Sequence, residues 1–278
     1  MPSRDDAGLD LPVHSVRARN LAGDTENRIH EDSVARQHGF AGGLVAGITT
    51  YAYMARPAVE RWGAGWLEGG EFRVRLEAPV YDGDALTVHA GIQRDGDGDE
   101  RMVIEARNAR GVVCGRGEAR ARRRLDPADV AGPGAHVEPP ADRPPITRDA
   151  LAAAGPLGAR ARTFRADRAA EFLDAIDDPA AVFREGPAHP GWVVFDANQV
   201  LAQNFVMGPW IHVETHATHL ALIGDGDRVS MRGSVAELFE RKGHEFVVLD
   251  LVSVAERDGA VLPVARFRHT AIYRLAPR

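Results

Sequence analysis

Cysteine and lysine are almost absent from this sequence of 278 residues. Cys114 is the single cysteine, which excludes an internal disulfide framework and favours a reducing compartment. Its neighbours Val112, Val113 and Gly115 are typical of a strand, so we expect a small buried side chain rather than a reactive thiol. Lys242 is the single lysine. Arginine supplies the other positive charges, which we interpret mainly as the compositional bias of a GC-rich genome.

Long apolar runs are also lacking. No stretch of about 18 apolar residues occurs, so we expect no membrane span, and residues 1–11 are too polar for a signal peptide. The formal net charge of −6 and the pI of about 6.0 give no electrostatic footprint for nucleic acid. A local basic patch for an anionic cofactor tail stays open. With 44% hydrophobic and 27% charged residues, the chain is expected to be a globular protein of the cytoplasm.

A segment rich in Pro, Gly and Ala divides the chain into halves of similar length. Residues 125–147 show no hydrophobic period, as is typical of a connector. We therefore expect an N-terminal unit over residues 1–124 and a C-terminal unit over residues 148–278. Each unit has a size that a single hydrophobic core can serve.

The two halves repeat one order of elements. A largely apolar helix is predicted over 47–62 and another over 190–207, and each precedes an extended segment and an Asp-Gly-Asp turn, at 82–84 and at 225–227. The helix starts and the turns share one offset of 143 residues. Alternating and β-branched residues then predict further strands. These runs cover 86–92, 101–109 and 111–122 in the first half, and 228–238, 245–256 and 260–275 in the second.

A helix that is hydrophobic over most of its surface has to be enclosed, and long antiparallel strands can wrap it. Such a helix followed by such strands, made twice, is the pattern of a hotdog fold. We therefore predict an α+β double hotdog in one chain, with two antiparallel sheets that each wrap a central helix. An α+β domain whose halves only look alike is the alternative.

The segment 20–51 contains the best candidates for catalytic and substrate-binding residues. Asn27 and His30 lie three residues apart in a turn-rich stretch, and Asp32 can cap the short amphipathic piece that follows. Gly47 opens the predicted helix, where free N–H groups and the positive end of the helix dipole can meet a carbonyl oxygen. A histidine near such a helix start offers two of the parts that acid–base chemistry beside a thioester needs. The alternative is that Asn27 and His30 only stabilise an irregular loop.

This segment resembles the hydratase motif of the MaoC-like, R-specific enoyl-CoA hydratase family (hydratase 2), whose known double members have two hotdog units in one chain. The motif is roughly G-D-x-N-P-hydrophobic-H-x-D, followed downstream by a glycine that opens the central helix. The matching residues here are Gly23, Asp24, Asn27, Ile29, His30 and Asp32, with Gly47 as the later glycine and further likeness at Trp62, Gly63, Pro79, Val80, Gly83 and Asp84. The resemblance covers most of the first half.

Two departures from the motif concern the acid partner of His30. Arg28 replaces the motif proline, and one extra residue separates the Gly-Asp pair from the asparagine. Counted back from His30, the acid position falls on Thr25, and Asp24 reaches it only if the loop bulges. Glu26 is a second nearby carboxylate.

The resemblance implies hydration or dehydration of an enoyl (3-hydroxyacyl) thioester. Asp24 and His30 would be the catalytic pair and hold a water that adds to C3 while a proton reaches C2. Asn27 and Gly47 would bind the substrate, with the Gly47 N–H on the thioester oxygen. The family implies no cofactor and no metal, and a thioester of CoA or acyl carrier protein as substrate. Homodimers are common in the family, so a homodimer is a candidate assembly.

The C-terminal half holds a competing candidate. The run from His189 to Trp192, with Asp196, is similar to the helix start of bacterial acyl-carrier-protein dehydratases, and Asp196 stands at their acid position. Their histidine, about 14 residues earlier, would fall on Val182. We therefore expect Asp196 to be a polar wall residue that contacts substrate, and this half to serve acyl binding and structure. A thioesterase that uses Asp196, or a non-catalytic acyl-binding subunit, are the alternative functions.

Three histidines follow the second helix in the run from Ile211 to His219. On a regular strand His212 and His216 would point to one face and His219 to the other. Because no nearby cysteine completes a compact metal motif, we expect polar lining here rather than a metal site.

Overall fold

The structure is a computed structural model that describes residues 11–22, 25–94, 99–121, 134–184 and 186–277. Gly23, Asp24 and the part of the expected connector at 125–133 lie outside the described residues. The described strands are β1 Leu11–Arg17, β2 Glu71–Leu76, β3 Ala85–Arg94, β4 Glu100–Asn108, β5 Val113–Arg120, β6 Arg162–Thr163, β7 Ile211–His219, β8 Arg228–Arg241, β9 His244–Arg257 and β10 Ala260–Arg274. The predicted β-rich runs are confirmed as β3 to β5 and β8 to β10.

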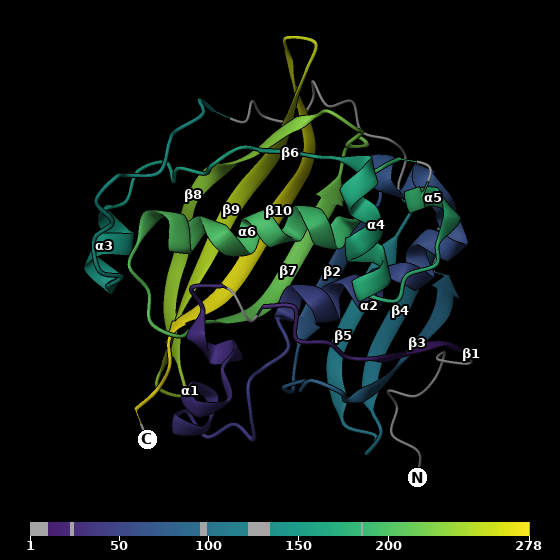
Figure 1. Cartoon of the computed structure of the whole chain (residues 1–278), viewed down its shortest axis with the longest axis horizontal. Helices are drawn as coiled ribbons and strands as arrows, with labels where there is room; N and C mark the ends of the chain where they lie inside the picture. Colours follow the sequence, from purple (N-terminus) through teal and green to yellow (C-terminus); the bar gives the residue numbers. More distant parts are fainter. Residues whose placement is uncertain (1–10, 23–24, 95–98, 122–133, 185, 278) are drawn as a thin grey trace.

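The strands form one antiparallel sheet in the order β1-β3-β4-β5-β2-β7-β10-β9-β8-β6. Outward from the contact of β2 with β7, both halves follow one order, which is β5, β4, β3, β1 on one side and β10, β9, β8, β6 on the other. The predicted internal repeat therefore extends to the connectivity of the strands. Figure 1 shows the two halves side by side, blue for the first and green to yellow for the second.

The prediction of two separate sheets is wrong, because β2 and β7 join the halves into one continuous sheet. They pair antiparallel from Glu71 opposite Thr218 to Arg75 opposite Glu214. Each strand would otherwise be an exposed sheet edge with unpaired N–H and C=O groups, and the pairing satisfies both edges at once. The fold is α+β and hotdog-like, with a ten-stranded sheet among the described residues.

Six α-helices and two 3-10 helices lie among the described residues. They are η1 Arg28–His30, α1 Asp32–Gln37, α2 Gly47–Trp62, η2 Gly63–Glu68, α3 Arg148–Ala153, α4 Ala166–Ala175, α5 Ala181–Arg184 and α6 Pro190–Asn204. The helix predicted over 47–62 is α2 with the same bounds. The helix predicted over 190–207 is α6 and ends at Asn204, because Val206 leaves the helix to bond with the backbone of Pro144 and Ile146.

The two central helices, α2 and α6, pack against each other and against the sheet. Tyr51, Met54 and Ala58 of α2 are fully buried, as an enclosed helix requires. A Cβ on Gly191 would lie 2.7 Å from the Cβ of Ala52, so the missing side chain permits the close approach of α6 to α2. In Figure 1, α6 crosses in front of β8, β9 and β10. Most residues of α6 are buried.

A β-bulge in β7 changes which histidines face inward. Thr270 of β10 pairs with Glu214, but the next residue, Ala271, pairs with His212, so Val213 is the extra residue. A bulge of this kind inverts the alternation of side chains beyond it. His212 and His219 are therefore both buried and His216 is exposed, which overturns the predicted grouping of His212 with His216.

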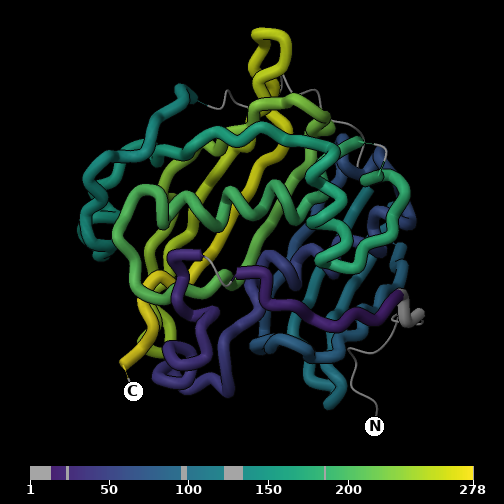
Figure 2. Tube along the Cα trace, viewed as in Figure 1, coloured from purple at the N-terminus to yellow at the C-terminus, as the bar shows by residue number. Residues whose placement is uncertain are grey.

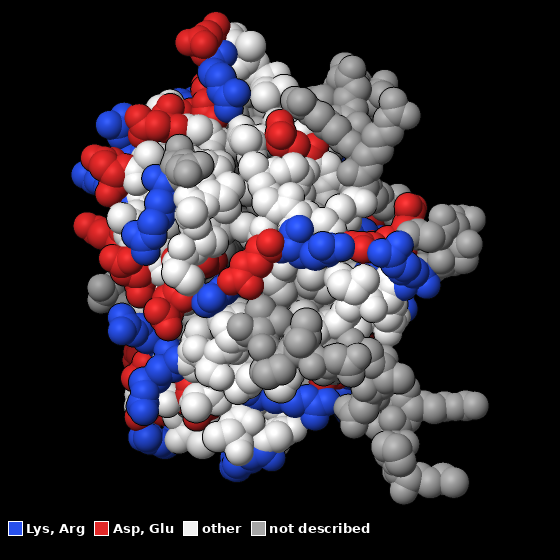
Figure 3. Space-filling view, turned by 90° about the vertical axis from the view of Figure 1, so that its right-hand side faces the viewer, with Lys and Arg blue, Asp and Glu red and all other residues white. Residues whose placement is uncertain are grey.

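The loop of residues 25–46 lies beside the C-terminal end of the chain, as the tube in Figure 2 shows. Ile29, Ala35 and Leu44 form a small apolar cluster there, against which Leu275 packs. In the face seen in Figure 3, acidic and basic side chains are interspersed around white areas. None of the described helices is long and apolar enough to cross a membrane.

Candidate active site

A cavity of about 380 Å³ lies at the junction of the two halves. The first half contributes the loop before α2, the N-terminus of α2 and the end of β2, and the second half contributes α6, β7 and the β8–β9 turn. The lining includes Asn27, His30, Leu44, Gly47, Thr50, Leu76, Glu77, Asn198, Trp210, His212, Arg241, Lys242, His244 and Phe246. Asn27, His30 and Gly47, which were predicted from the sequence to act together, thus line one cavity.

Asn27 is buried and ties the loop to the second half. Its side-chain oxygen accepts from the N–H of Trp210 at 3.1 Å and of Ile29 at 3.3 Å, so it also caps η1. Its Nδ2 donates to the Trp210 carbonyl at 2.9 Å and lies 3.3 Å from Nε2 of His30. Asn27 therefore positions the loop and the His30 ring.

His30 lines the cavity, and both of its ring nitrogens have a hydrogen-bond contact. Its Nδ1 lies 2.7 Å from the Leu44 carbonyl, which only accepts, so Nδ1 carries the proton. Nε2 is then the basic nitrogen, consistent with the donor Nδ2 of Asn27 beside it. Burial lowers the pKa of His30, and the bond to Leu44 partly opposes this. The imidazole is thus neutral and basic near pH 7.

Gly47 is the first residue of α2 and cannot be replaced without collision. A Cβ there would lie 2.5 Å from Cδ1 of Leu76 and 2.8 Å from Nδ1 of His212. The preceding residue, Ala46, provides no side-chain cap. The first N–H groups of a helix have no partner inside it, so the start of α2 offers a donor to the cavity.

The acid partner expected for His30 is not found among the described residues near it. Asp24 lies outside the described residues. Thr25 donates its hydroxyl to the carbonyl of Ala22 at 2.9 Å, and Glu26 is exposed and paired with Arg143 at 2.8 Å. These two contacts leave neither Thr25 nor Glu26 directed at His30.

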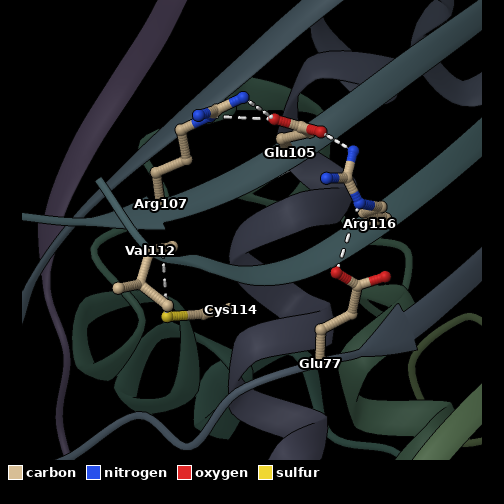
Figure 4. Close-up of polar contacts among 6 residues, drawn as sticks. All are labelled: Glu77, Glu105, Arg107, Val112, Cys114 and Arg116. Carbon is tan, nitrogen blue, oxygen red and sulfur yellow. Dashed lines mark hydrogen bonds and ion pairs between the residues drawn. The ribbon is translucent and has the colours of Figure 1, made fainter. Parts of the chain in front are cut away.

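Glu77 is the one carboxylate among the described residues that line the cavity. Figure 4 shows its side chain paired with Arg116, which also contacts Glu105, and Arg107 bonds the same Glu105. Glu77 thus belongs to an ion-pair network. The same view places Cys114 beside the carbonyl of Val112, and its buried thiol confirms the prediction made for this cysteine.

Asp196 does not join the residues that line the cavity. It is buried on α6, and its two carboxylate oxygens lie 2.7 and 3.0 Å from the guanidinium of Arg162. Burial raises the pKa of Asp196, and the charge of Arg162 opposes this. The structure therefore does not bring Asp196 to His30.

His189, the other histidine of this region, caps the start of α6. Its Nδ1 accepts from the Gly191 N–H at 2.9 Å, and its Nε2 lies 3.2 Å from Asp178. Both side chains are buried away from the cavity around His30. These contacts explain His189 as a helix cap.

The cavity rim is basic although the chain is acidic overall. Arg75, Arg241 and Lys242 line it together with the single carboxylate Glu77, whereas the whole chain has a net charge of −6. Arg241 ends β8, and Lys242 and Gly243 form a two-residue turn with φ of 52° and 77°. Sequence reasoning missed these residues because they lie far from the motif in the chain.

Comparisons with known proteins show the fold. A scan against protein-family models and a search of curated proteins both find no match. Among solved structures, a conserved hypothetical protein from Mycobacterium tuberculosis with a double hotdog fold matches with a TM-score of 0.65, at 13% identity over 93% of both chains.

Two further similar structures carry MaoC names. A protein from Chloroflexus aurantiacus described as a MaoC domain protein dehydratase gives a TM-score of 0.58, at 14% identity over 89% of this chain and 88% of that one. A MaoC-like dehydratase gives 0.56, at 12% identity over 94% and 99%. At these identities the likeness establishes a hotdog-type fold, and the activity has to be argued from the site.

Proposed function

We propose that this chain adds water to an enoyl thioester, or removes it from the 3-hydroxyacyl thioester, in the cavity around His30. The observation that carries the proposal is that His30, with Nδ1 held by the Leu44 carbonyl and Nε2 left unprotonated, lines the same cavity as the start of α2. A fixed base and a helix N-terminus at one cavity are two of the groups that this reaction requires. The names of the two MaoC-type structures support the same reaction class.

In the direction of hydration, water replaces the Asn27 amide as the hydrogen-bond donor to Nε2 of His30. Nε2 then takes a proton from this water as the water oxygen bonds to C3. The electrons of the C2–C3 double bond move toward the carbonyl, and the Gly47 N–H stabilises the negative charge that develops on the thioester oxygen. A proton then reaches C2 from the second acid–base group, for which Asp24 is our candidate. The net change is one water added across the double bond.

The basic rim suits a thioester whose carrier bears phosphate. Arg241 and Lys242 belong to the second half, yet they line the cavity whose chemistry belongs to the first. Neither has an ion pair among the described residues, and both are exposed. A phosphate of CoA or of a carrier-protein pantetheine arm can therefore meet them without displacing an existing partner.

The alternative of a thioesterase gains no support from the site. That reaction was expected to use Asp196, whose carboxylate is held by Arg162 outside the cavity lining. The C-terminal half instead contributes a wall, formed by Asn198, Trp210 and the β8–β9 turn. This arrangement favours acyl and carrier binding as the role of the second half.

The test is to incubate the wild-type protein with crotonyl-CoA and follow two signals. We expect the absorbance of the enoyl group to fall while no free thiol appears, because water adds to carbon and the thioester stays intact. Release of CoA thiol from crotonyl-CoA or butyryl-CoA would instead show a thioesterase. Neither signal, with crotonyl-CoA bound, would favour a non-catalytic acyl-binding protein.

A further inference from the structure

A second polar group stands beside Gly47, and the mechanism above does not use it. His212 lines the cavity, is buried, and holds its Nδ1 2.8 Å from the position that a Cβ on Gly47 would take. Nδ1 has no hydrogen-bond partner among the described residues. A buried polar atom without a partner costs free energy. Nδ1 of His212 lies beside the N-terminus of α2, a helix of 16 residues, whose first N–H groups also lack partners within the helix. Two unpartnered groups at one cavity indicate a ligand that bonds to both.

The inward position of His212 is produced by the bulge at Val213. Without this extra residue, His212 would share a face with the exposed His216. Bulges are found next to active sites, where they redirect a side chain. The bulge at Val213 thus directs the imidazole of His212 to the N-terminus of α2.

The other nitrogen of His212 belongs to a buried polar chain across β7 and β10. Its Nε2 lies 2.8 Å from Oγ1 of Thr215, and the same oxygen lies 2.8 Å from Nδ1 of His269. The two rings stack with centroids 4.6 Å apart. A hydroxyl has a single proton, so Thr215 donates to one imidazole and accepts from the other.

The hydrogen-bonded series His212–Thr215–His269 has two proton arrangements when both imidazole rings are neutral. In one, His269 donates to Thr215, Thr215 donates to Nε2 of His212, and Nδ1 of His212 carries a proton. In the other, every donor is reversed and Nδ1 is bare. A carbonyl oxygen has only lone pairs to offer, so a thioester oxygen beside Gly47 favours the arrangement with a proton on Nδ1.

We propose that His212 Nδ1–H is a second donor to the thioester carbonyl oxygen, beside the Gly47 N–H, and that Thr215 and His269 support this tautomer by a hydrogen bond from the Thr215 hydroxyl to Nε2. His212 would then be a catalytic residue, and Thr215 and His269 positioning residues. The inference rests on the proposed thioester chemistry of the cavity. The two proposals concern different atoms. His212 would bind the carbonyl oxygen of the thioester, whereas His30 would take a proton from the attacking water.

The test uses butyryl-CoA labelled with ¹³C at the carbonyl, which binds but has no double bond to hydrate. Hydrogen bonds to the oxygen lower the infrared stretching frequency of the carbonyl. We expect this lowering in the wild-type complex, and part of it to be lost in His212→Leu and in Thr215→Val. His219→Leu is the matched control, because His219 is also buried on β7 but does not line this cavity. It should retain the wild-type frequency.

Nitrogen NMR of the wild-type complex tests the tautomer without any substitution, in case a variant fails to fold. A protonated Nδ1 on His212 is expected, and a bare Nδ1 would overturn the proposal. An unchanged carbonyl frequency in a folded His212→Leu protein would overturn it too, even if crotonyl-CoA is hydrated. Conversely, a frequency that depends on His212 in a protein without hydratase activity would support this inference and reject the proposed reaction.

Discussion

At the scale of single residues, the site depends on how the backbone holds His30. The Leu44 carbonyl fixes the proton on Nδ1, and Asn27 ties the loop to Trp210 of the other half. Both contacts use backbone groups, so they hold the ring without adding charge near it. The fold itself thus orients the ring that we propose as the general base.

The lowered pKa of His30 predicts the pH dependence of the reaction. Burial favours the neutral ring, and the neutral ring is the form that can accept a proton from water. Activity is therefore lost as the pH falls through the pKa of His30, and we expect the acid limb of kcat/KM for crotonyl-CoA to have its midpoint below 6.5, the ordinary histidine value. A midpoint above 6.5 would contradict the assignment of His30 as the buried base.

At the scale of elements, the β8–β9 turn brings Arg241 and Lys242 of the second half to the cavity. Lys242, the only lysine of the chain, adopts a left-handed conformation that costs an L-residue about 1–2 kcal/mol. A glycine would adopt it without this cost. A strained cation at a cavity rim is consistent with a binding role.

The substitution Lys242→Gly distinguishes the effect of Lys242 on stability from its proposed effect on phosphate binding. The free energy of unfolding should stay within about 1 kcal/mol of wild type, because glycine suits the turn. The KM for crotonyl-CoA should rise roughly 3- to 10-fold through the loss of one phosphate contact. The KM for the crotonyl thioester of N-acetylcysteamine, which has no phosphate, should not change.

The control for this experiment is Arg168→Ala, which removes an exposed cation of α4 away from the cavity. It should leave both KM values at the wild-type level. An equal rise of KM for both thioesters in Lys242→Gly would mean that the turn shapes the cavity and does not bind phosphate.

The helices and strands could be predicted from the sequence where the pattern that indicates them lies within a short stretch of residues. Both central helices were predicted at their true first residues, Gly47 and Pro190, because apolar periodicity and glycine or proline at a helix start are read within one window. The long strands followed from alternation for the same reason. Asn27 and His30 were found as neighbours in a motif, although their roles remain proposals.

The parts that sequence reasoning missed depend on contacts between distant segments. The pairing of β2 with β7 joins the two halves, and no local pattern in either strand specifies it. The inward turn of His212 follows from a single extra residue, Val213, which shifts the alternation. Asp196 was expected to contact substrate, but it pairs with Arg162. Arg162 lies 34 residues earlier in the chain, and no pattern in the sequence indicates this ion pair.

At the scale of the whole molecule, the continuous sheet encloses several uncharged histidines. Burial lowers the pKa of His269 to about 4, and burial together with the nearby His189 lowers the pKa of His219 to about 4. The same two causes, burial and then the neighbouring His269, hold the pKa of His212 well below its ordinary value. The fold therefore keeps these rings neutral while an unfolded chain can protonate them.

This difference predicts that stability falls as the pH falls. Between about pH 6.5 and pH 4 the unfolded chain binds more protons than the folded one, so stability is full above pH 6.5 and is lost below it. The free energy of unfolding, measured in urea, should be lower at pH 5.5 than at pH 7 by roughly 1 kcal/mol for each such ring. His219→Leu should reduce this dependence, and equal stability at both pH values would contradict it.

The central claim is that the cavity shared by the two halves adds water to an enoyl thioester with His30 as base. Its most direct test is the rate of crotonyl-CoA hydration by His30→Ala, measured beside His38→Ala. His38 follows directly after α1 and does not line the cavity. We predict that His30→Ala lowers kcat about 10²- to 10⁴-fold and that His38→Ala retains the wild-type rate. A folded His30→Ala protein that hydrates crotonyl-CoA at the wild-type rate would contradict the account.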